Sequence, residues 1–320
     1  MSSVSGGNTP GSHSKVSSMY PLLQHVHGKE NVDVCRVWKL PLQGGALDLR
    51  SIVREWSCDI TLHSPDMAKA YLVGDNTGMT ATDTMKNTVY RVAKQQARPC
   101  GPEEFAARLA RHYVNTYPLL TGATVRVRQK SWERYGGKHV HGFTGSPTAP
   151  MRVAEAEATR VGGGGVSVKV TSTVSGLELL KTTQSGYEGY IRDEATSLPE
   201  TRERMLGTCA TASWVCHGTV SDYDRVYDRV LDAMLRAFFG PDDKGVYSPS
   251  VQYTLHKMAS AALDAVPAVA SVTMEMPNLH YLPTPPLTKF EDDVYVVAPN
   301  PHGLIRATVV RDGVGAASKL

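Results

Sequence analysis

The sequence predicts an α+β fold of two similar halves, in which each half is an antiparallel four-stranded sheet with two helices on one face. The first observation is that segments rich in β-branched residues, with apolar residues at every second position, flank segments whose apolar residues recur every three or four positions. The second is that this order of two strands, two helices and two strands occurs twice in the 320 residues. The halves share no detailed sequence repeat, so the duplication is inferred from the order of the elements. Helices cover one face of such a sheet, and the other face must be buried elsewhere.

Composition places the chain among ordinary globular proteins. It is 41% hydrophobic and 20% charged, and its length predicts about two domains. The formal charge of +3 comes from 34 basic and 31 acidic residues, and no run of Lys and Arg alternates with aromatic residues, which argues against nucleic acid as a partner. No apolar segment approaches the ~18 residues of a membrane span, so no membrane partner is expected. An odd number of cysteines without CxxC spacing or a signal peptide predicts reduced thiols inside a cell: Cys35, Cys58, Cys100, Cys209 and Cys216.

The first half follows a polar tail. Residues 1–18 are almost all Ser, Gly, Asn, Thr and His, and they carry too little apolar surface to fold, so we expect them to be disordered. Residues 34–38 are rich in β-branched side chains and predict a strand, with Lys29 at the point where a loop leads into it. Two further strands are expected over residues 48–58 and 60–73, with polar turns between them.

Two helices are expected next. Residues 85–94 form the first, and Thr82 or Asp83 can act as its N-cap, because either side-chain oxygen can accept the free amides of a first helical turn. The second begins at Pro102, a favourable first position, and carries apolar residues four apart on one face, namely Phe105, Leu109 and Tyr113. Residues 125–128 then alternate Val and Arg, which predicts an antiparallel strand with one solvated face.

The second half is predicted to begin after a linker. Residues 147–165 lose hydrophobic periodicity and end in four glycines, and we interpret them as the connection between the halves. A strand with alternating valines follows from residue 166, Ser175 and Gly176 predict a turn, and residues 177–180 predict the returning strand. Helices are expected over residues 222–239 and from about Pro249 to Pro267. Their apolar faces are Val226, Val230, Met234 and Phe238 on the first, and Leu255, Met258, Ala259, Ala262, Leu263 and Val266 on the second.

His139 and His141 are a candidate metal site, because alternate residues of a strand face the same way and imidazole is a common ligand. The number of ligands decides such a site, and the sequence offers no third ligand at a suitable spacing. We therefore interpret the two histidines as a surface pair or a hydrogen-bonded pair, and expect no metal.

Residues 74–90 hold an unusual density of small polar groups. They combine Asp75-Asn76-Thr77, Ala81-Thr82-Asp83-Thr84 and Lys86-Asn87-Thr88. Taken alone, they favour a capped helix beside a solvated turn. They also resemble the signature of the urate oxidase (uricase) family, and the resemblance extends over roughly residues 20–320. The other motifs that carry it, in the family's order, are Gly28-Lys29-Glu30-Asn31-Val32, Lys138-His139-Val140-His141-Gly142-Phe143, Ser185-Gly186-Tyr187-Glu188-Gly189-Tyr190-Ile191-Arg192-Asp193-Glu194, Leu198-Pro199-Glu200-Thr201-Arg202-Glu203-Arg204, Ser250-Val251-Gln252, Pro277-Asn278-Leu279-His280-Tyr281 and Asn300-Pro301-His302-Gly303-Leu304-Ile305.

The resemblance implies two tandem tunnelling-fold (T-fold) units, which we place at residues 19–155 and 156–317. It also implies a homotetramer whose sheets join around a β-barrel tunnel. Each active site would then be shared between subunits. One chain would supply Lys29 and Thr82, and another would supply Tyr187, Arg204, Gln252, Asn278 and His280.

The substrate implied by the resemblance is urate, a flat anion with carbonyl acceptors and N–H donors along its edges. Arg204 offers a planar fork of donors that suits one edge. Gln252, with one acceptor and two donors, and the Val251 amide suit the opposite edge. Tyr187 would stack on the ring where the family usually has phenylalanine, so its hydroxyl needs a partner of its own. The remaining substrate-binding positions implied are Thr82, Asp83, Leu198 and Asn278.

The family uses no metal, flavin or other cofactor, so none is expected here. The implied proton relay consists of Lys29, Thr82 and His280: the Thr82 hydroxyl, bonded to Lys29, passes a proton through water, and the His280 imidazole passes it on. Thr82 and Asn278 would hold O2, and then the attacking water, over the ring. The implied reaction converts urate, O2 and water to 5-hydroxyisourate and H2O2, a step of purine degradation towards allantoin.

Two other functions stay open on the sequence. A pterin enzyme of the cyclohydrolase or aldolase kind would share the fold and bind a similar heterocycle, but it would generally need different acid–base or zinc-binding residues. A purine-binding or structural barrel protein without activity would also share the fold, and only an assay separates it from an active enzyme.

The last three residues, Ser318-Lys319-Leu320, form a peroxisomal address that an import receptor reads. Such a tripeptide is weak evidence by itself. It agrees with an enzyme that releases H2O2, so we expect the protein in peroxisomes or in a related organelle such as the glycosome.

Overall fold

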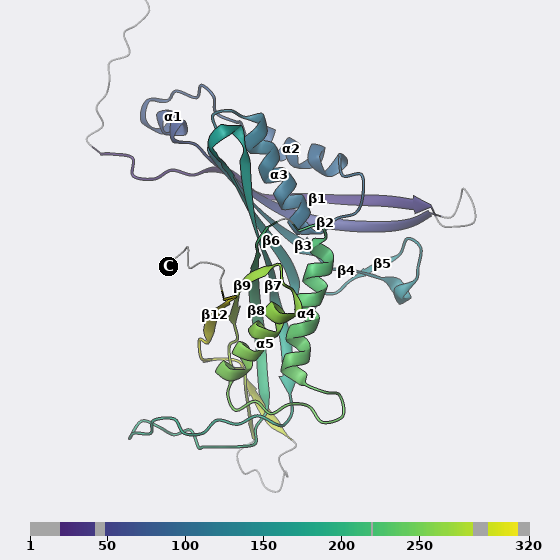
Figure 1. Cartoon of the computed structure of the whole chain (residues 1–320), viewed down its shortest axis with the longest axis vertical. Coiled ribbons are helices and arrows are strands. Elements are labelled where there is room, and N and C mark those ends of the chain that lie inside the picture. The colour runs from purple at the N-terminus through teal and green to yellow at the C-terminus, as the bar shows by residue number, and fades with distance from the viewer. Residues whose placement is uncertain (1–19, 42–48, 219, 284–293, 313–320) are drawn as a thin grey trace, which may run out of the picture.

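A computed structural model describes residues 20–41, 49–218, 220–283 and 294–312. Over these residues the main sheet has eight strands, and every neighbouring pair is antiparallel. In spatial order they are β1 (His27–Pro41), β2 (Leu49–His63), β3 (Gly122–Lys130), β6 (Met151–Arg160), β7 (Val166–Lys181), β8 (Leu206–Cys216), β9 (Val269–Glu275) and β12 (Arg306–Val310). Two small sheets pair β4 (Trp132–Arg134) with β5 (Phe143–Gly145), and β10 (His280–Pro283) with β11 (Tyr295–Ala298). The predicted α+β class with antiparallel sheets is confirmed (Figure 1).

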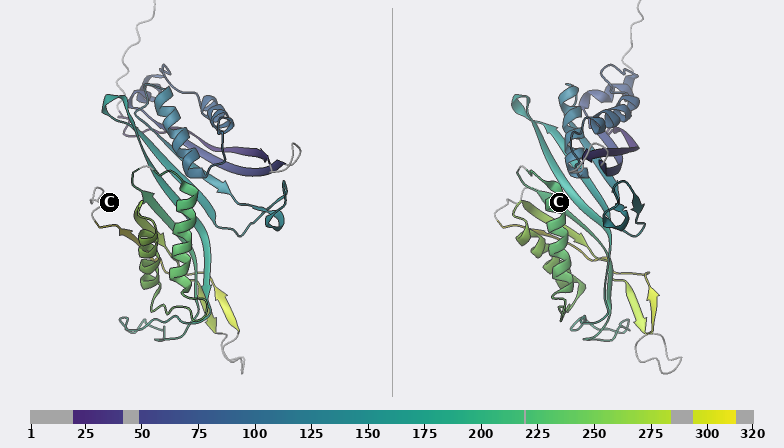
Figure 2. Two further views of the ribbon diagram at one scale, coloured as in Figure 1. Left: turned by 45° about the vertical axis from the view of Figure 1, so that its right-hand side comes forward. Right: turned by 90° about the vertical axis from the view of Figure 1, so that its right-hand side faces the viewer.

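The helices lie between the second and third strands of each half of the main sheet. The first half has α1 (Ala68–Val73), α2 (Thr82–Lys94) and α3 (Pro102–Thr116), and the second has α4 (Tyr223–Phe239) and α5 (Val251–Ala265). Short 3-10 turns occur at η1 (Pro65–Met67), η2 (Tyr135–Gly137) and η3 (Gly162–Gly164). Figure 2 shows the long helices grouped against the strands of their own half.

Buried apolar side chains form two clusters along the one sheet. The first joins α2 and α3 to the strands of the first half and includes Val170, whereas the second joins α4 and α5 to β7, β8 and β9 and includes Val174. Val170 and Val174 are four positions apart on β7, so they project from the same face of the strand. Both pairs of helices therefore cover the same face of the sheet. Trp56 stacks on Phe105 in the first cluster, with ring centroids 4.3 Å apart.

The predicted helix faces are confirmed. The helix α3 begins at Pro102. The apolar residues that recur four apart along α3 are fully buried, namely Phe105, Leu109 and Tyr113. In α4, Val230, Met234 and Phe238 are buried, and Asp222 caps the helix by accepting the Arg225 amide at 2.9 Å. Ser250 caps α5 in the same way by accepting the Tyr253 amide at 3.1 Å. Fully burying one large apolar side chain contributes roughly 1.5–3 kcal/mol, so these faces bind the helices to the sheet.

The predicted N-cap of α2 is wrong. The helix begins at Thr82 and its N-cap is Ala81, which has no side-chain oxygen to offer. Thr82 and Asp83 are instead the first two helical residues. Asp83 turns to its own helix, because its carboxylate pairs with Lys86 at 2.8 Å and accepts from Asn87 at 2.8 Å. An acidic residue in a first turn is stabilised by the helix dipole without serving as the cap.

The predicted strand over residues 60–73 is also wrong beyond His63. Residues 49–63 form one strand, after which the chain turns into η1 and α1. The Ser64 hydroxyl accepts the Asp66 amide at 3.3 Å, and Pro65 takes the first position of the 3-10 turn. This local start of a helix ends the strand at His63, because Pro and a capping Ser favour a helical first turn.

Two predictions about the middle of the chain are corrected. Residues 147–165 are not a linker, because β6 within them is a central strand of the sheet. The core face of β6 is made of alanines, which allow α3 to pack closely but carry a weak hydrophobic signal. Ser175 and Gly176 form no turn, since β7 runs through them with a register shift between Val174 and Leu177. A glycine inside a strand often marks such a bulge, and Gly176 has a φ of 76°.

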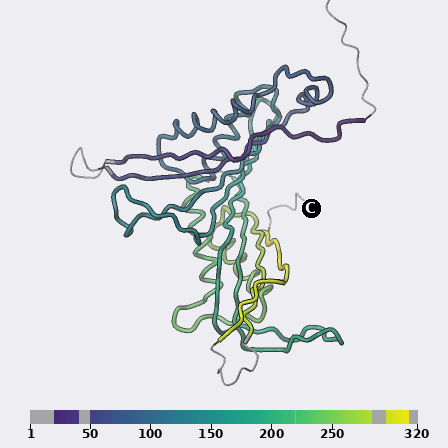
Figure 3. The backbone as a smooth tube through the Cα atoms, turned by 180° about the vertical axis from the view of Figure 1, so that it is seen from behind, coloured from purple at the N-terminus to yellow at the C-terminus, as the bar shows by residue number. Residues whose placement is uncertain are grey.

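Residues 182–205 and the β10–β11 hairpin extend from the end of the molecule opposite to α1 and α2 (Figure 3). The division into units at residue 155 falls within β6, and that boundary stays a prediction. In the part of the chain that the structure describes, none of the helices has the length and apolar content needed to cross a membrane.

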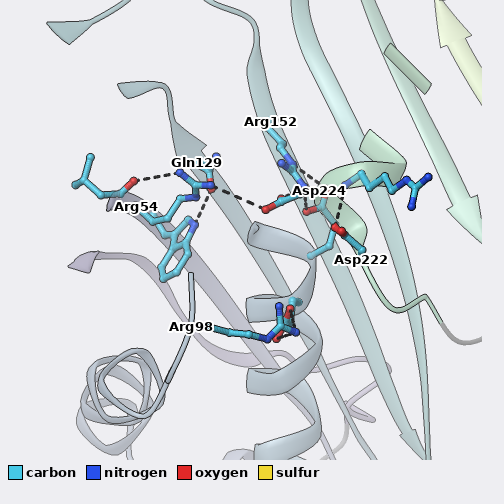
Figure 4. A network of polar contacts seen from close by, with 11 residues as sticks. Arg54, Arg98, Gln129, Arg152, Asp222 and Asp224 are labelled. Carbon is cyan, nitrogen blue, oxygen red and sulfur yellow. Dashed lines mark hydrogen bonds and ion pairs between the residues drawn. The ribbon is translucent and has the colours of Figure 1, made fainter. Parts of the chain in front are cut away.

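A partly buried ion cluster joins the two halves, with Glu103 fully buried and the Asp224 side chain 39% exposed. Arg152 of β6 bonds to Glu103 of α3 through two contacts of 3.1 and 2.6 Å, and it pairs with Asp224 of α4 at 2.7 Å (Figure 4). Its guanidinium also lies 4.2 Å from the Tyr227 ring centre. Burial raises the pKa of Glu103, and the Arg152 charge opposes this shift. A Cβ on Gly101 would overlap Asp224 Oδ1 and lie 2.6 Å from Arg152 Nη2, so any larger residue would force the side chains of the cluster to shift.

Candidate active site

A cavity of about 320 Å³ lies between residues 182–205 and the segment that joins β9 to β10. Its wall is partly aromatic and carries one guanidinium, one imidazole, one carboxamide and the Glu203 carboxylate, which accepts the Thr183 hydroxyl at 2.5 Å. Five of the residues predicted for the site line it: Tyr187, Leu198, Arg204, Asn278 and His280. The other nine lining residues were not predicted as site residues, namely Thr182, Pro199, Thr201, Glu203, Met205, Leu279, Tyr281, Leu282 and Tyr295. Thr201 lies within a recognised motif, whereas Tyr295 has no motif around it.

Arg204 is held in the cavity wall by its backbone. Its amide donates to the Ser185 carbonyl at 2.8 Å, and Tyr187 and Thr201 exchange backbone bonds of 2.7 and 3.1 Å. These bonds fold residues 185–204 into a narrow loop. Gly186 makes the close approach possible, since a Cβ there would overlap the Tyr247 hydroxyl and lie 2.8 Å from the Thr201 carbonyl.

The Arg204 guanidinium is well placed to meet an acceptor. Its Cζ lies 5.4 Å from the Tyr187 ring centre, and its buried Nε has no hydrogen-bond partner among the described residues. Burial lowers the pKa of Arg204, while Tyr187 and Tyr247 act in the opposite direction. An arginine nevertheless stays charged, because its ordinary pKa is far above neutral. A buried charged donor without a partner is costly, so a ligand oxygen at this point would be bound strongly.

Tyr187 offers only part of its ring to a ligand. One face stacks on Tyr190, with centroids 4.8 Å apart and planes 11° from parallel. The predicted stacking of Tyr187 on the substrate must therefore use the surface turned to the cavity. Leu198 contributes an apolar wall, and its carbonyl accepts the Tyr190 hydroxyl at 2.5 Å.

Asn278 and His280 come from the segment after β9. Asn278 Nδ2 lies 3.4 Å from His280 Nδ1, so the amide can donate a weak bond to the ring when that nitrogen is unprotonated. Leu279 between them donates its amide to the Gly207 carbonyl at 2.9 Å, which attaches the segment to the start of β8. The Tyr281 ring covers Gly207 so closely that a Cβ would overlap it.

Val251 and Gln252 do not line this cavity. They are the first two residues of α5, where Val251 is buried and Gln252 is exposed. The segment that leads to them is bonded to the loop that carries Tyr187. Gly186 donates to the Ser248 carbonyl at 2.9 Å, and Ser248 donates to the Gln184 carbonyl at 2.9 Å. The two predicted substrate edges are therefore joined by backbone bonds.

Lys29 lies on β1 rather than where a loop meets a strand, at a register shift between Lys29 and Val32. The bulge is fixed by Asn31, whose φ is 55° and whose amide donates to Asp59 Oδ1 at 2.9 Å. Arg128 pairs with Asp59 and donates to Asn31 Oδ1 at 2.9 Å. Burial raises the pKa of Asp59, but the bonds from Arg128 and the Asn31 amide lower it more, so the pKa lies below its usual value.

Thr82 and Asp83 lie near Lys29. The turn before α2 is tied to β1, because the His27 ring nitrogen lies 2.7 Å from the Thr80 carbonyl. Lys86 is the main cause of the lowered pKa of Asp83, and the Lys29 charge adds to it. Thr82 and Asp83 are both exposed.

One chain does not bring all the predicted residues together. The group of Lys29, Thr82 and Asp83 lies at the end that carries α1 and the start of α2, and the Arg204 cavity lies at the opposite end (Figures 1 and 2).

His139 and His141 lie between η2 and β5, away from these groups in the sequence. Their ring centres are 4.7 Å apart, and the His139 Nδ1 atom accepts the Gly142 amide at 2.8 Å. Within the described ranges, His, Cys, Asp and Glu side chains form no group of three that could hold a metal ion.

Comparison with known proteins decides the family. A family model described as Uricase matches residues 25–162 and 170–306. The chain belongs to the uricase family. Uricase-2 of Phaseolus vulgaris is 44% identical over 308 residues, covering 89% of this chain and 94% of that protein. The uricase of Arabidopsis thaliana is 40% identical over 308 residues, with coverage of 90% and 96%. The crystal structure of uricase from Arthrobacter globiformis is similar with a TM-score of 0.82 at 29% identity, and it covers 94% of this chain and 98% of that one.

The uricase family also accounts for the order of the motifs in this chain. The matched segments include the Lys29 and Thr82 group as well as the residues that line the Arg204 cavity. Both groups are therefore parts of one family pattern, although they lie apart in the single chain.

Proposed function

We propose that this protein oxidises urate with O2 and water to 5-hydroxyisourate and H2O2, without a metal or organic cofactor. Membership of the uricase family supports the reaction. The observation that carries the assignment of the site is the Arg204 guanidinium in the wall of a partly aromatic cavity, with a buried nitrogen that lacks a partner among the described residues. A flat anion with carbonyl oxygens supplies what that group lacks.

The binding residues divide the edges of urate between them. Arg204 donates two bonds to an oxygen and an adjacent ring nitrogen of the anion, and the Gln252 carboxamide with the Val251 amide takes the opposite edge. Tyr187 stacks on the ring and Leu198 closes the cavity on its apolar side. Asp83 and Thr82 complete the binding set.

The chemical steps use a proton relay. Lys29 and Thr82 remove a proton from urate through water, and the electron-rich ring then reacts with O2 to give a hydroperoxide. Asn278 and Thr82 hold O2 first and the attacking water afterwards. Water replaces the hydroperoxide group, which leaves as H2O2, and His280 passes the proton released from that water. Atoms balance, because urate gains one oxygen from water and O2 leaves as H2O2.

The site proposed here is shared between chains of a homotetramer whose sheets close a barrel. The separation of the Lys29 and Thr82 group from the Arg204 cavity along one chain supports this arrangement. In a symmetric assembly, each chain gives one group to a neighbouring site and completes its own site with the neighbour's group.

The direct test is the loss of urate absorbance in air, with purified protein and no added cofactor. We expect turnover, and we expect a chelator to leave the rate unchanged. Absence of turnover in a folded, correctly assembled protein would contradict the proposed function. Recovery of a chelated, inactive enzyme by one added metal would contradict its independence from metals.

We also propose that the protein resides in peroxisomes or a related organelle through Ser318-Lys319-Leu320, which lies outside the described residues, as does the tail at residues 1–18. An import receptor that reads this tripeptide would be a partner. Deleting Leu320 should leave a tagged protein in the cytosol, and a punctate distribution that does not change would count against the signal.

A further inference from the structure

Lys181 is a buried lysine close to the proposed site. It is the last residue of β7 and only 9% exposed. Its ammonium donates to the Val246 carbonyl at 2.9 Å and to the Ser248 hydroxyl at 2.6 Å, and it lies 5.2 Å from the Phe238 ring centre. Among the described residues no carboxylate forms an ion pair with it.

Such a lysine needs an explanation, because lysine is almost never buried without an opposite charge. Burial disfavours its charged form and lowers its pKa. Two neutral acceptors and an aromatic ring replace only part of the lost hydration. The side chain reaches from β7 to the segment at residues 246–250. Its bonds therefore fix the distance between β7 and that segment.

The two segments that Lys181 joins carry the two predicted edges of the substrate site. On one side, β7 continues directly into the loop of Tyr187 and Arg204. On the other, Val246 and Ser248 precede Val251 and Gln252 by a few residues. The backbones of these segments are bonded between Gly186 and Ser248, and also between Ser248 and Gln184. Lys181 adds side-chain bonds to the same contact.

Backbone bonds alone leave this contact weakly specified. It is a single parallel bridge between Ser185 and Ser248, outside the named strands. The Gln184 side chain adds one bond to the Lys244 carbonyl at 2.7 Å. Gln184 itself is only half-buried and has a φ of 57°. The Lys181 ammonium contacts a backbone carbonyl and a side chain of the facing segment at once, which fixes the register of the two segments.

We propose that Lys181 is a positioning residue that sets the spacing between the Arg204 edge and the Gln252 edge of the urate site. This inference rests on the proposed function. Lys181 takes no proton and touches no substrate. When it is lost, the two edges no longer hold urate at the same time, and binding weakens although the relay of Lys29, Thr82 and His280 is intact.

The test compares Lys181→Met with Lys169→Met in the full-length protein. Lys169 lies on the same strand, its side chain is 57% exposed, and its nearest ion pair, with Glu157, is 4.0 Å long, so it is a matched control. Equilibrium binding of urate is measured under argon, where no turnover occurs, and KM and kcat are measured in air. We expect Lys181→Met to raise both Kd and KM about tenfold and to leave kcat within about threefold, as expected when only uniform binding is lost. Lys169→Met should match wild type.

Ser248→Ala gives a second, milder variant in case Lys181→Met does not fold. It removes one acceptor of the ammonium and leaves the backbone bonds of Ser248 in place. We expect a KM increase of about threefold, and no further increase when it is added to Lys181→Met, because coupled residues are not additive. The inference is overturned if Kd and KM stay at the wild-type value while activity falls only with the amount of folded protein, or if the two changes add.

The outcomes for the proposed function are separate. Wild-type protein that binds urate under argon but does not consume it in air would contradict the proposed function, and the ratio of Kd between variant and wild type would still decide the role of Lys181.

Discussion

Two inactive variants, expressed together, test whether one active site takes residues from two chains. Thr82 lies near Lys29 at one end of the molecule, and Arg204 lies in the cavity at the other end. Thr82→Ala should lose mostly turnover, because it removes the relay hydroxyl. Arg204→Ala should lose binding, because a urate oxygen is left without its donors. Each variant alone should therefore be severely impaired.

The expected recovery follows from symmetry. In a two-fold pair each site combines the first-half residues of one chain with the second-half residues of the other. A site is intact only when its first half comes from an Arg204→Ala chain and its second half from a Thr82→Ala chain. With random assortment each condition holds in one case of two, so roughly one site in four is intact and activity should return to roughly a quarter of wild type.

The assay is the consumption of urate by mixed assemblies, isolated through different tags on the two chains. A matched control combines Arg204→Ala with Gln252→Ala. Both changes lie in the second half, so every site keeps a defect and no recovery is expected. If mixed assemblies form and the activity of the Thr82→Ala and Arg204→Ala pair stays at the level of the separate variants, the shared-site model is wrong, and the pocket lies within one chain.

Three further predictions concern single residues. Gly101→Ala should destabilise the fold by roughly 1–3 kcal/mol, because a Cβ overlaps the ion cluster. Calorimetry should show this loss of stability. The control Gly162→Ala, whose Cβ would have nothing within 4 Å, should be as stable as wild type. The pKa of Asp59 is lowered in the folded protein, so its charge stabilises the fold above the unfolded pKa of about 4 and this benefit is lost as the pH falls. Asp59→Asn should therefore lower the unfolding temperature near pH 7, and the difference from wild type should shrink as the pH falls below about 4 and through the lowered folded-state pKa. A difference that stays constant as the pH falls would refute the assignment. Arg204→Lys should raise the KM for urate about 10- to 100-fold, since one charge-assisted bond of roughly 1.5–3 kcal/mol is lost; an unchanged KM would show that Arg204 does not bind the substrate in two places.

The class of the fold, the long helices and the family were all predictable from the amino-acid sequence. The faces of α3, α4 and α5 were predictable because burial along a helix repeats every three to four residues, and that period is written in the sequence. The family was predictable because its motifs are short, local and in order. The five residues of the Arg204 cavity came from those motifs, and the structure places them around one cavity.

The tertiary structure decided what depends on contacts between distant segments. The apolar residues on the core face of β6 are the small Ala154, Ala156 and Ala158, so its place in the centre of the sheet follows from the packing of α3 and not from a strong hydrophobic pattern. β7 passes through Ser175 and Gly176 because β8 pairs with it on both sides of the bulge, up to Val174 and again from Leu177. The local signals of both features are weak, because alternating alanines carry little hydrophobicity and a glycine suits a turn as well as a bulge.

Contacts between distant segments also decide which charged residues are buried. Glu103 reads as an ordinary residue of a first helical turn, yet it is fully buried because Arg152 from another segment meets it. Lys181 reads as a solvated lysine at the end of a strand, yet Val246 and Ser248 enclose it. Burial of a charge depends on partners far away in the chain, and the distance between Lys29 and Arg204 likewise depends on how the whole sheet is assembled. These are properties of the folded chain, because the free energy of a buried charge is set by its surroundings rather than by its neighbours in sequence.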